Sequence, residues 1–346
     1  PFSSAASGIR ADTLDFPGLD AFVLVDDADN ERYRPQAGGD GADALTVAEV
    51  QLLLSEALVV ANRTRAQIRT PLGSAARVSI SVVDTNGTIL GIVRSRDAPV
   101  FGVDVSLQKA RTASFFSSAN AATALSAVPD AAYLDSGLSL LRREALSQYV
   151  AAAQTFLGLP AALTDGAVAF SDRAGGNLSR PFFPDGVTGN PAGPFSKPAG
   201  EWSPFSTGLQ LDLVHNALVQ HVGFVAGLVP DVPQNCTGIG GFDAGFAPAG
   251  SFSALANGMQ IFPGSVPVYR GNVLVGGIGV SGDGVDQDDL IAFLAVHAAS
   301  LQSGINNADP AMRADQLTPL GSRLRYVNCP VSPFLDSDEQ NVCAGK

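Results

Sequence analysis

Two strand–turn–strand segments, at residues 78–93 and 266–280, constrain the fold of this chain more than any other feature. In the first, an apolar run meets Asp84-Thr85-Asn86-Gly87, whose Asn-Gly pair supplies the positive φ angles that a tight hairpin turn requires. The second reverses at Arg270-Gly271-Asn272, between two further runs rich in valine. Each segment therefore predicts an antiparallel hairpin.

Helical patterns flank both hairpins. Thr46 and Glu49 form the signature of a capping box, and apolar residues then recur at helical spacing as far as Ala61. Residues 106–116 predict a second helix, and residues 286–301 predict a third, with acidic residues on a first turn that favours them. The order helix, hairpin, helix, insertion, hairpin, helix predicts an α+β fold, in which flanking helices cover an antiparallel sheet.

The predicted organisation has four parts. They are an N-terminal extension (1–45), a domain built from 46–120 plus 260–302, an insertion (121–259) and a C-terminal tail (303–346). The extension contains one candidate strand at 21–25.

The insertion is expected to consist mostly of helices and loops. Residues 139–156 predict a helix, and residues 209–229 predict a buried helix. Between them, residues 171–208 are rich in Gly, Pro, Phe and Asn and predict a long loop. A loop of that length inside a compact domain is usually functional or an interaction surface.

Charge and hydropathy exclude two classes of partner. The 346 residues carry a formal charge of −12, so the field of the protein repels phosphate backbones and anionic membranes. No apolar run has the length of a membrane span. We therefore expect neither nucleic-acid binding nor a transmembrane segment.

Cysteine usage bears on the cellular compartment. Cys329 and Cys343 flank a short polar loop and are predicted to form a disulfide, which would close a loop of about 15 residues and contribute about 3 kcal/mol. The alternative is that these two residues and Cys236 are all reduced. The predicted disulfide, with a start at Pro1 rather than Met, leads us to expect a periplasmic or secreted protein.

Several motifs have a structural explanation that we favour over a chemical one. Gly277-Ile278-Gly279-Val280-Ser281-Gly282 has the glycine spacing of a dinucleotide fingerprint but begins inside a strand, so we interpret its glycines as relief of crowding and a turn. Asp283, Asp286, Asp288 and Asp289 could supply oxygens to a metal, although a helix start explains them as well. The acidic segment 26–31 lacks the glycine and the terminal glutamate of an EF-hand and is interpreted as a solvated turn. Metal content therefore stays unknown.

Catalytic signatures are not found in the sequence. It has three histidines, no G-x-S-x-G elbow and no C-x-x-C-H haem attachment motif, so any haem would be bound noncovalently. We predict no catalytic residue.

Three segments together resemble one known family. They are Val82-Val83-Asp84-Thr85-Asn86-Gly87 with its return strand to Arg94-Ser95-Arg96-Asp97, the helix start Ser106-Leu107-Gln108-Lys109-Ala110-Arg111-Thr112, and Val266-Pro267-Val268-Tyr269 through Gly276-Gly277-Ile278-Gly279-Val280-Ser281-Gly282-Asp283-Gly284. This order resembles the GlcG/HbpS-like haem-binding family. The resemblance implies a profilin-like or PAS-like sheet, frequent homo-oligomers and, in some members, haem binding.

Six residues are candidates for contacting a ligand. Arg94 and Arg96 share a strand face and could anchor a carboxylate or propionate. Lys109 and Thr112 match the helix motif of the family. Phe101 precedes that helix. His297 is the candidate iron ligand, although a histidine among apolar residues is more often part of a core.

Three functions are compatible with these sequence features. The leading hypothesis is an exported binding protein for haem or a similar flat anionic small molecule, held noncovalently between an apolar wall and a few polar groups. The second is a structural or interaction subunit of an oligomer, whose contacts come from the insertion loop and the aromatic residues Phe182, Phe183, Phe195, Trp202 and Phe205. The third is an enzyme with unidentified redox or hydrolytic chemistry.

Overall fold

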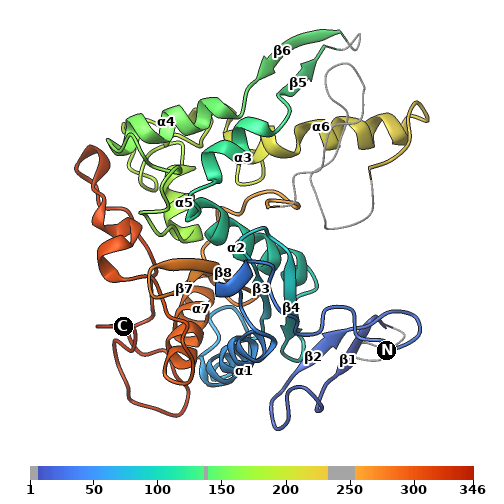
Figure 1. The fold of residues 1–346 in the computed structure, drawn as a ribbon, viewed down its shortest axis with the longest axis vertical. Coiled ribbons are helices and arrows are strands. Elements are labelled where there is room, and N and C mark those ends of the chain that lie inside the picture. Colours follow the sequence, from blue (N-terminus) through green and yellow to red (C-terminus); the bar gives the residue numbers. More distant parts are fainter. Residues whose placement is uncertain (1–6, 136–138, 233–253) are drawn as a thin grey trace.

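The structure is a computed structural model that describes residues 7–135, 139–232 and 254–346. Its main feature is a six-stranded antiparallel sheet of order β1-β2-β4-β3-β8-β7 (Figure 1). The strands are β1 (Ile9–Ala11), β2 (Phe22–Leu24), β3 (Ser79–Val83), β4 (Ile89–Arg94), β7 (Ser265–Arg270) and β8 (Val273–Ser281). Helices flank this sheet, so the predicted α+β class is confirmed.

The two predicted hairpins form the centre of the sheet. β3 pairs with β4 in the first and β7 pairs with β8 in the second, while β3 also pairs with β8 and joins them. The segment 21–25 contains β2, which pairs with β4 at Phe22 opposite Arg94. The N-terminal extension thus contributes two strands to the sheet.

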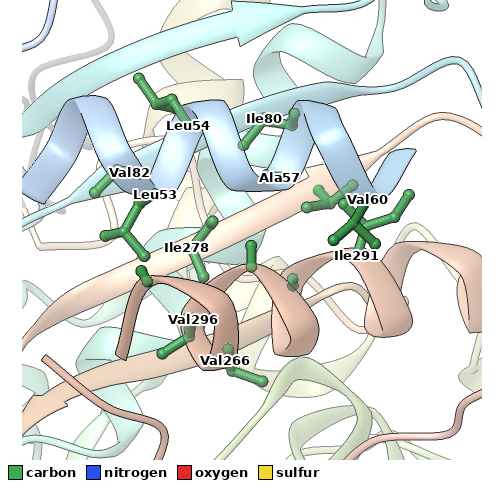
Figure 2. Packing of buried hydrophobic residues seen from close by; sticks show 14 of the residues in the cluster. Leu53, Leu54, Ala57, Val60, Ile80, Val82, Val266, Ile278, Ile291 and Val296 are labelled. Atoms are coloured by element: carbon green, nitrogen blue, oxygen red, sulfur yellow. The ribbon is translucent and has the colours of Figure 1, made fainter. Parts of the chain in front are cut away.

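One face of the sheet is covered by α1 (Val47–Arg63) and α7 (Val285–Ser300). The predicted capping box is present in α1, where Thr46 accepts from the Glu49 amide and Glu49 accepts from the Thr46 amide. Figure 2 shows Leu53 and Ala57 of α1, Ile291 of α7 and Ile278 of β8 in one apolar layer. These side chains are buried, and the layer they form is the main core of the protein.

The opposite face is covered by α2 (Gly102–Phe116), which packs directly on β8 and β3. Gly277 and Gly279 alternate with the core residues Ile278 and Val280 and therefore point to the α2 side. A Cβ at Gly279 would lie 2.1 Å from the Ser106 carbonyl oxygen, and one at Gly277 would lie 2.4 Å from that of Ala110. The glycines allow the close approach of a helix, which accounts for a spacing that resembles a dinucleotide fingerprint.

The insertion builds a second core at one end of α2. Its elements are α3 (Ala121–Ala127), β5 (Ala131–Leu134), β6 (Leu140–Glu144), α4 (Ser147–Leu157), α5 (Asp172–Leu178) and α6 (Gly208–Val225). Phe115 and Phe116 of α2 pack into this core with Phe183 and Phe195. Short 3-10 turns lie at Gly41–Asp43, Ala199–Glu201, Pro310–Met312, Ala314–Gln316 and Pro319–Gly321.

Three predictions for the insertion were wrong in part. The helix expected over 139–156 is divided, because 140–144 pairs with β5 as a hairpin strand and the helix α4 begins only at Ser147. The helix expected over 209–229 forms as α6, but its C-terminal half is largely exposed rather than buried. The loop expected over 171–208 contains the short helix α5.

The C-terminal tail returns to α1. The Arg65 amide donates to the Pro333 carbonyl, and the Leu335 amide donates to that of Arg63. The predicted disulfide between Cys329 and Cys343 is present and closes the tail loop. Cys236 lies outside the described residues. Among the described residues, no helix is both long and apolar enough to cross a membrane.

The contact between α2 and β8 leads to a first prediction. Gly279→Ala is expected to lower the free energy of unfolding by about 1–3 kcal/mol, because α2 must move away from the strand to admit a methyl group. Gly200→Ala is the matched control, since its Cβ would meet no atom within 4 Å. Urea unfolding followed by circular dichroism measures both changes, and equal stabilities of the two variants would contradict the proposed role of Gly279.

Candidate functional site

A hollow of about 400 Å³ lies where α2, the start of α7 and the insertion meet. It is called the Lys109 pocket here and is lined by Ile68, Phe101, Val105, Gln108, Lys109, Pro204, Phe205, Gln210, Gln260, Phe262, Ser281, Gly282, Asp283, Gly284, Val285 and Asp288. Its volume falls within the range typical of small-molecule sites.

The rim of the pocket is aromatic and exposed. Phe101 precedes α2 and is 62% exposed, while Phe205 belongs to the insertion and is 83% exposed. Large apolar side chains with that much exposure at the mouth of a hollow are typical of binding sites. The two rings are positioned by different parts of the chain, so the pocket depends on the insertion as well as on the sheet.

The floor of the pocket is a buried ion pair. The Lys109 ammonium lies 2.9 Å from Asp288 Oδ2 and also donates to the Val280 carbonyl at 2.8 Å. Lys109 is 2% exposed and Asp288 is 3% exposed. Burial raises the pKa of Asp288, while the Lys109 charge opposes that rise.

Amide side chains line the region between rim and floor. Gln260 Nε2 donates to Gln108 Oε1 at 2.7 Å, and Gln260 Oε1 accepts from the Ile261 amide. Thr112 Oγ1 accepts from the Gln260 amide at 2.8 Å, so Thr112 holds this loop against α2. The pocket therefore offers neutral hydrogen-bonding groups above a neutralised ion pair.

The other aspartates at the start of α7 already have basic or amide partners. Asp283 accepts from Arg69 Nε and from the Ile68 and Arg77 amides. Arg173 forms ion pairs with Asp286 at 2.6 Å and with Asp289 at 2.5 Å. Burial raises the pKa of Asp289 to about 6 although Arg173 opposes the rise. These contacts explain the acidic run without a metal.

Asp172, at the start of α5, is the one carboxyl group of this region that lacks a partner within the described residues. It is fully buried, and neither of its oxygens accepts a hydrogen bond, although the Ser265 hydroxyl lies close by. Burial raises its pKa well above the ordinary value, while the charge of Lys109 opposes the rise. The protonated form of Asp172 is therefore favoured in the folded protein.

The structure groups the six predicted ligand contacts only in part. Phe101 and Lys109 line the pocket, and Thr112 supports it from behind. Arg94 is buried at the end of β4 and donates to the Ala98 carbonyl. Arg96 is exposed and pairs with Asp20 at 3.3 Å. Neither arginine lines the Lys109 pocket.

His297 also lies elsewhere. It is on the C-terminal half of α7, half-buried, and lines shallow hollows beside Lys346 and Asn341. Burial and the Lys346 charge lower its pKa. The structure thus separates His297 from Phe101 and Lys109.

The aromatic residues of the insertion loop lie mostly in the second core. Phe183 and Phe195 are buried, and Trp202 is half-buried with its Nε1 donating to the Ser179 carbonyl. Phe182 is half-buried as well. Phe205 is the exposed one of the five and lines the Lys109 pocket.

Sequence reasoning did not assign most of the lining residues to a small-molecule ligand, and the polar ones among these include Gln108, Gln260 and Asp288. Gln108 stands beside Lys109 in the helix motif, which was an available signal. Gln260 reaches α2 from across the whole insertion, and nothing local to residue 260 indicates that contact.

Comparison with known proteins confirms the family resemblance over part of the chain. The model of a family described as haem degrading protein HbpS-like matches residues 232–297, which include β7, β8 and most of α7. The match does not extend to the first hairpin or to α2. No curated protein matches the chain.

Two solved structures show a distant likeness. One is the Klebsiella pneumoniae protein ORFY of the DUF336 family, at 16% identity and a TM-score of 0.33, covering 78% of this chain and 96% of that one. The other is a PduOC–haem complex, at 14% identity and a TM-score of 0.30, covering 77% and 99%.

The buried carboxyl of Asp172 leads to a second prediction. Its raised pKa means that its contribution to stability is present below about pH 3.8, the ordinary value, and is lost as the pH rises through the folded-state pKa. The side chain of the Asp172→Asn variant does not titrate. As the pH rises, the free energy of unfolding of the variant should therefore increase relative to that of the wild type, and it should be about 1–3 kcal/mol higher once Asp172 ionises. Urea unfolding at several pH values measures this difference, and parallel pH curves would contradict it.

Proposed function

We propose that the chain binds a flat, mostly apolar small molecule in the Lys109 pocket, noncovalently. The observation that carries the proposal is that two exposed rings, Phe101 and Phe205, both line a hollow of about 400 Å³ with polar groups at its base. Aromatic faces favour flat ligands by stacking, and the amides of Gln108 and Gln260 could meet a polar edge. The HbpS-like match makes a porphyrin the first ligand class to test.

The described lining residues could contact the porphyrin ring, but they do not include the side chains that usually coordinate its iron. Among the described residues that line the pocket there is no histidine, cysteine, methionine or tyrosine, the side chains that usually ligate haem iron. The lining cation Lys109 is already paired with Asp288, so strongly anionic ligands gain little here. We therefore expect binding by stacking and hydrogen bonds, without an axial ligand from this pocket.

The third prediction compares haemin with iron-free protoporphyrin IX. Both are expected to bind one to one with affinities within about threefold of each other, because iron makes no bond to the pocket. Absorbance titration measures haemin, and fluorescence measures the iron-free ring. Phe205→Ala should weaken both by about tenfold, since stacking energy of about 1 kcal/mol and buried area are lost together.

Two variants serve as controls for that experiment. Phe224→Ala removes a partly exposed ring on α6 that does not line the pocket, and His297→Ala removes the distant histidine. Neither should change the affinity. The proposal would be contradicted if neither porphyrin bound at micromolar concentration. It would also be contradicted if haemin bound much more tightly than the iron-free ring and His297→Ala abolished that difference.

The disulfide supports a further part of the proposal, that the protein functions in an oxidising compartment. Disulfides persist in secreted and periplasmic proteins and are rare where the thiol pool is reduced. The Cys329–Cys343 bond ties the tail loop next to the main core, which Cys329 and Cys343 contact.

A second candidate function, self-association, is favoured by α6. Leu218, Val222 and Val225 have the spacing of one helix face and are 50%, 67% and 73% exposed. Residues 213–229 contain no Asp, Glu, Lys or Arg, so a contact between two copies at this segment would place no like charges opposite each other. A second copy of the chain is therefore the partner that we propose for this face.

The fourth prediction tests self-association by size-exclusion chromatography with light scattering. The wild type is expected to form a dimer at micromolar concentration, and Val222→Glu is expected to give monomers because it places a carboxylate in the apolar face. Val331→Glu, at an exposed valine of the C-terminal tail, should leave the mass unchanged. A wild type that is monomeric at every concentration would contradict this function.

A further inference from the structure

Three carboxylates from the N-terminal segment converge at one point, away from the Lys109 pocket. Asp12 follows β1, Asp15 lies three residues further on, and Glu31 pairs with Val25 just beyond β2. Each offers one oxygen, and these oxygens lie within 4.8 Å of one another. Two oxygens that share a calcium ion at about 2.4 Å are at most about 4.8 Å apart, and the three oxygens meet this condition.

Glu31 is the member that indicates a missing partner. Its side chain is only 6% exposed, and its Oε1 is buried without a hydrogen-bond partner in the described structure. Burial, Asp12 and Asp15 together raise the pKa of Glu31 to about 7. A buried acceptor oxygen that no protein group satisfies, beside two other carboxylates, is the environment in which a cation would be most stabilising.

The groups that already contact the cluster leave this oxygen available. Asp12 Oδ1 accepts from the Leu14 and Asp15 amides, which orients Asp12. Arg34 is 56% exposed, donates to both carboxylate oxygens of Asp15, and reaches Glu31 only at Oε2, at 3.5 Å. Arg10, whose charge lowers the pKa of Glu31, has its ion pair with Asp29. Neither arginine bonds to Glu31 Oε1.

The neighbouring acidic turn differs in this respect. The Asp26 carboxylate accepts hydrogen bonds from the Ala28 and Asn30 amides and from the Asn30 side chain, all within the same turn. This arrangement agrees with the interpretation of the segment as a solvated turn. The Glu31 carboxylate lies near Asp12 and Asp15 and does not take part in the hydrogen bonds of the Asp26 turn.

We propose that Asp12, Asp15 and Glu31 form a binding site for a calcium ion. Calcium is a hard cation that accepts carboxylate oxygens in irregular geometry, whereas magnesium demands a near-ideal octahedron. Because the positive charges of Arg34 and Arg10 lie near the three carboxylates, we expect weak binding, in the range of extracellular calcium modules, with a Kd of about 10⁻⁴ to 10⁻³ M.

The experiment is calorimetric titration of the full chain, freed of metal, with calcium chloride. The wild type is expected to bind one ion, and Glu31→Gln is expected to bind at least about tenfold more weakly. Asp27→Asn is the matched control, because it removes one exposed charge from the adjacent turn and should keep wild-type affinity. Absence of binding at millimolar calcium, or equal affinity of Glu31→Gln and the wild type, would overturn the proposal.

Two further readouts distinguish a site from general screening of charge. Calcium should release a proton from Glu31 near pH 6.5, which comparison of buffers with different ionisation enthalpies detects, and Glu31→Gln should release none. Calcium should raise the melting temperature of the wild type but not that of Glu31→Gln. Without calcium, Glu31→Gln should melt at a temperature at least as high as that of the wild type. Equal proton release by the two proteins would count against Glu31 as a ligand.

Discussion

The close contact between α2 and β8 is the constraint on which the rest of the structure depends. Gly277 and Gly279 let the helix backbone lie directly on the strand, and that position sets how far the Lys109 side chain can reach. Its ammonium group donates a hydrogen bond to the Val280 carbonyl and forms an ion pair with Asp288 at the start of α7. One helix on a glycine-lined face thus connects the two sides of the sheet.

Burial of charge is the second theme of the molecule. Lys109 and Arg173 neutralise Asp288 and Asp289 in the interior, where removal of one partner of such a pair typically costs about 3–5 kcal/mol. Asp172 and Glu31 are two of the carboxyl groups in the described residues that have a buried oxygen without a hydrogen-bond partner. Their pKa values are raised for that reason, and one of the two lies beside further carboxylates that could share a cation.

Sequence patterns predicted the sheet region well and the insertion less well. Hairpins and the capped helix α1 are specified by neighbouring residues, such as Asn86-Gly87 and the Thr46–Glu49 pair, so they could be predicted. The segment 140–144 has a helical stripe but pairs with β5, because a partner strand outweighs a weak local preference. Residues 213–229 are apolar enough to suggest burial, yet no described element covers their exposed side chains.

The two hairpins, the helices that follow them and the pairing expected for the tail cysteines could be predicted because each depends on residues close together in the chain. By contrast, the packing of whole elements brings Phe101, Phe205 and Gln260 to the Lys109 pocket and leaves Arg94, Arg96 and His297 outside it. The same holds for Glu31, which turns from its own acidic segment toward Asp12 and Asp15. The physical reason is that such contacts form when whole elements pack, and local patterns of polarity do not report which distant surface an element will meet.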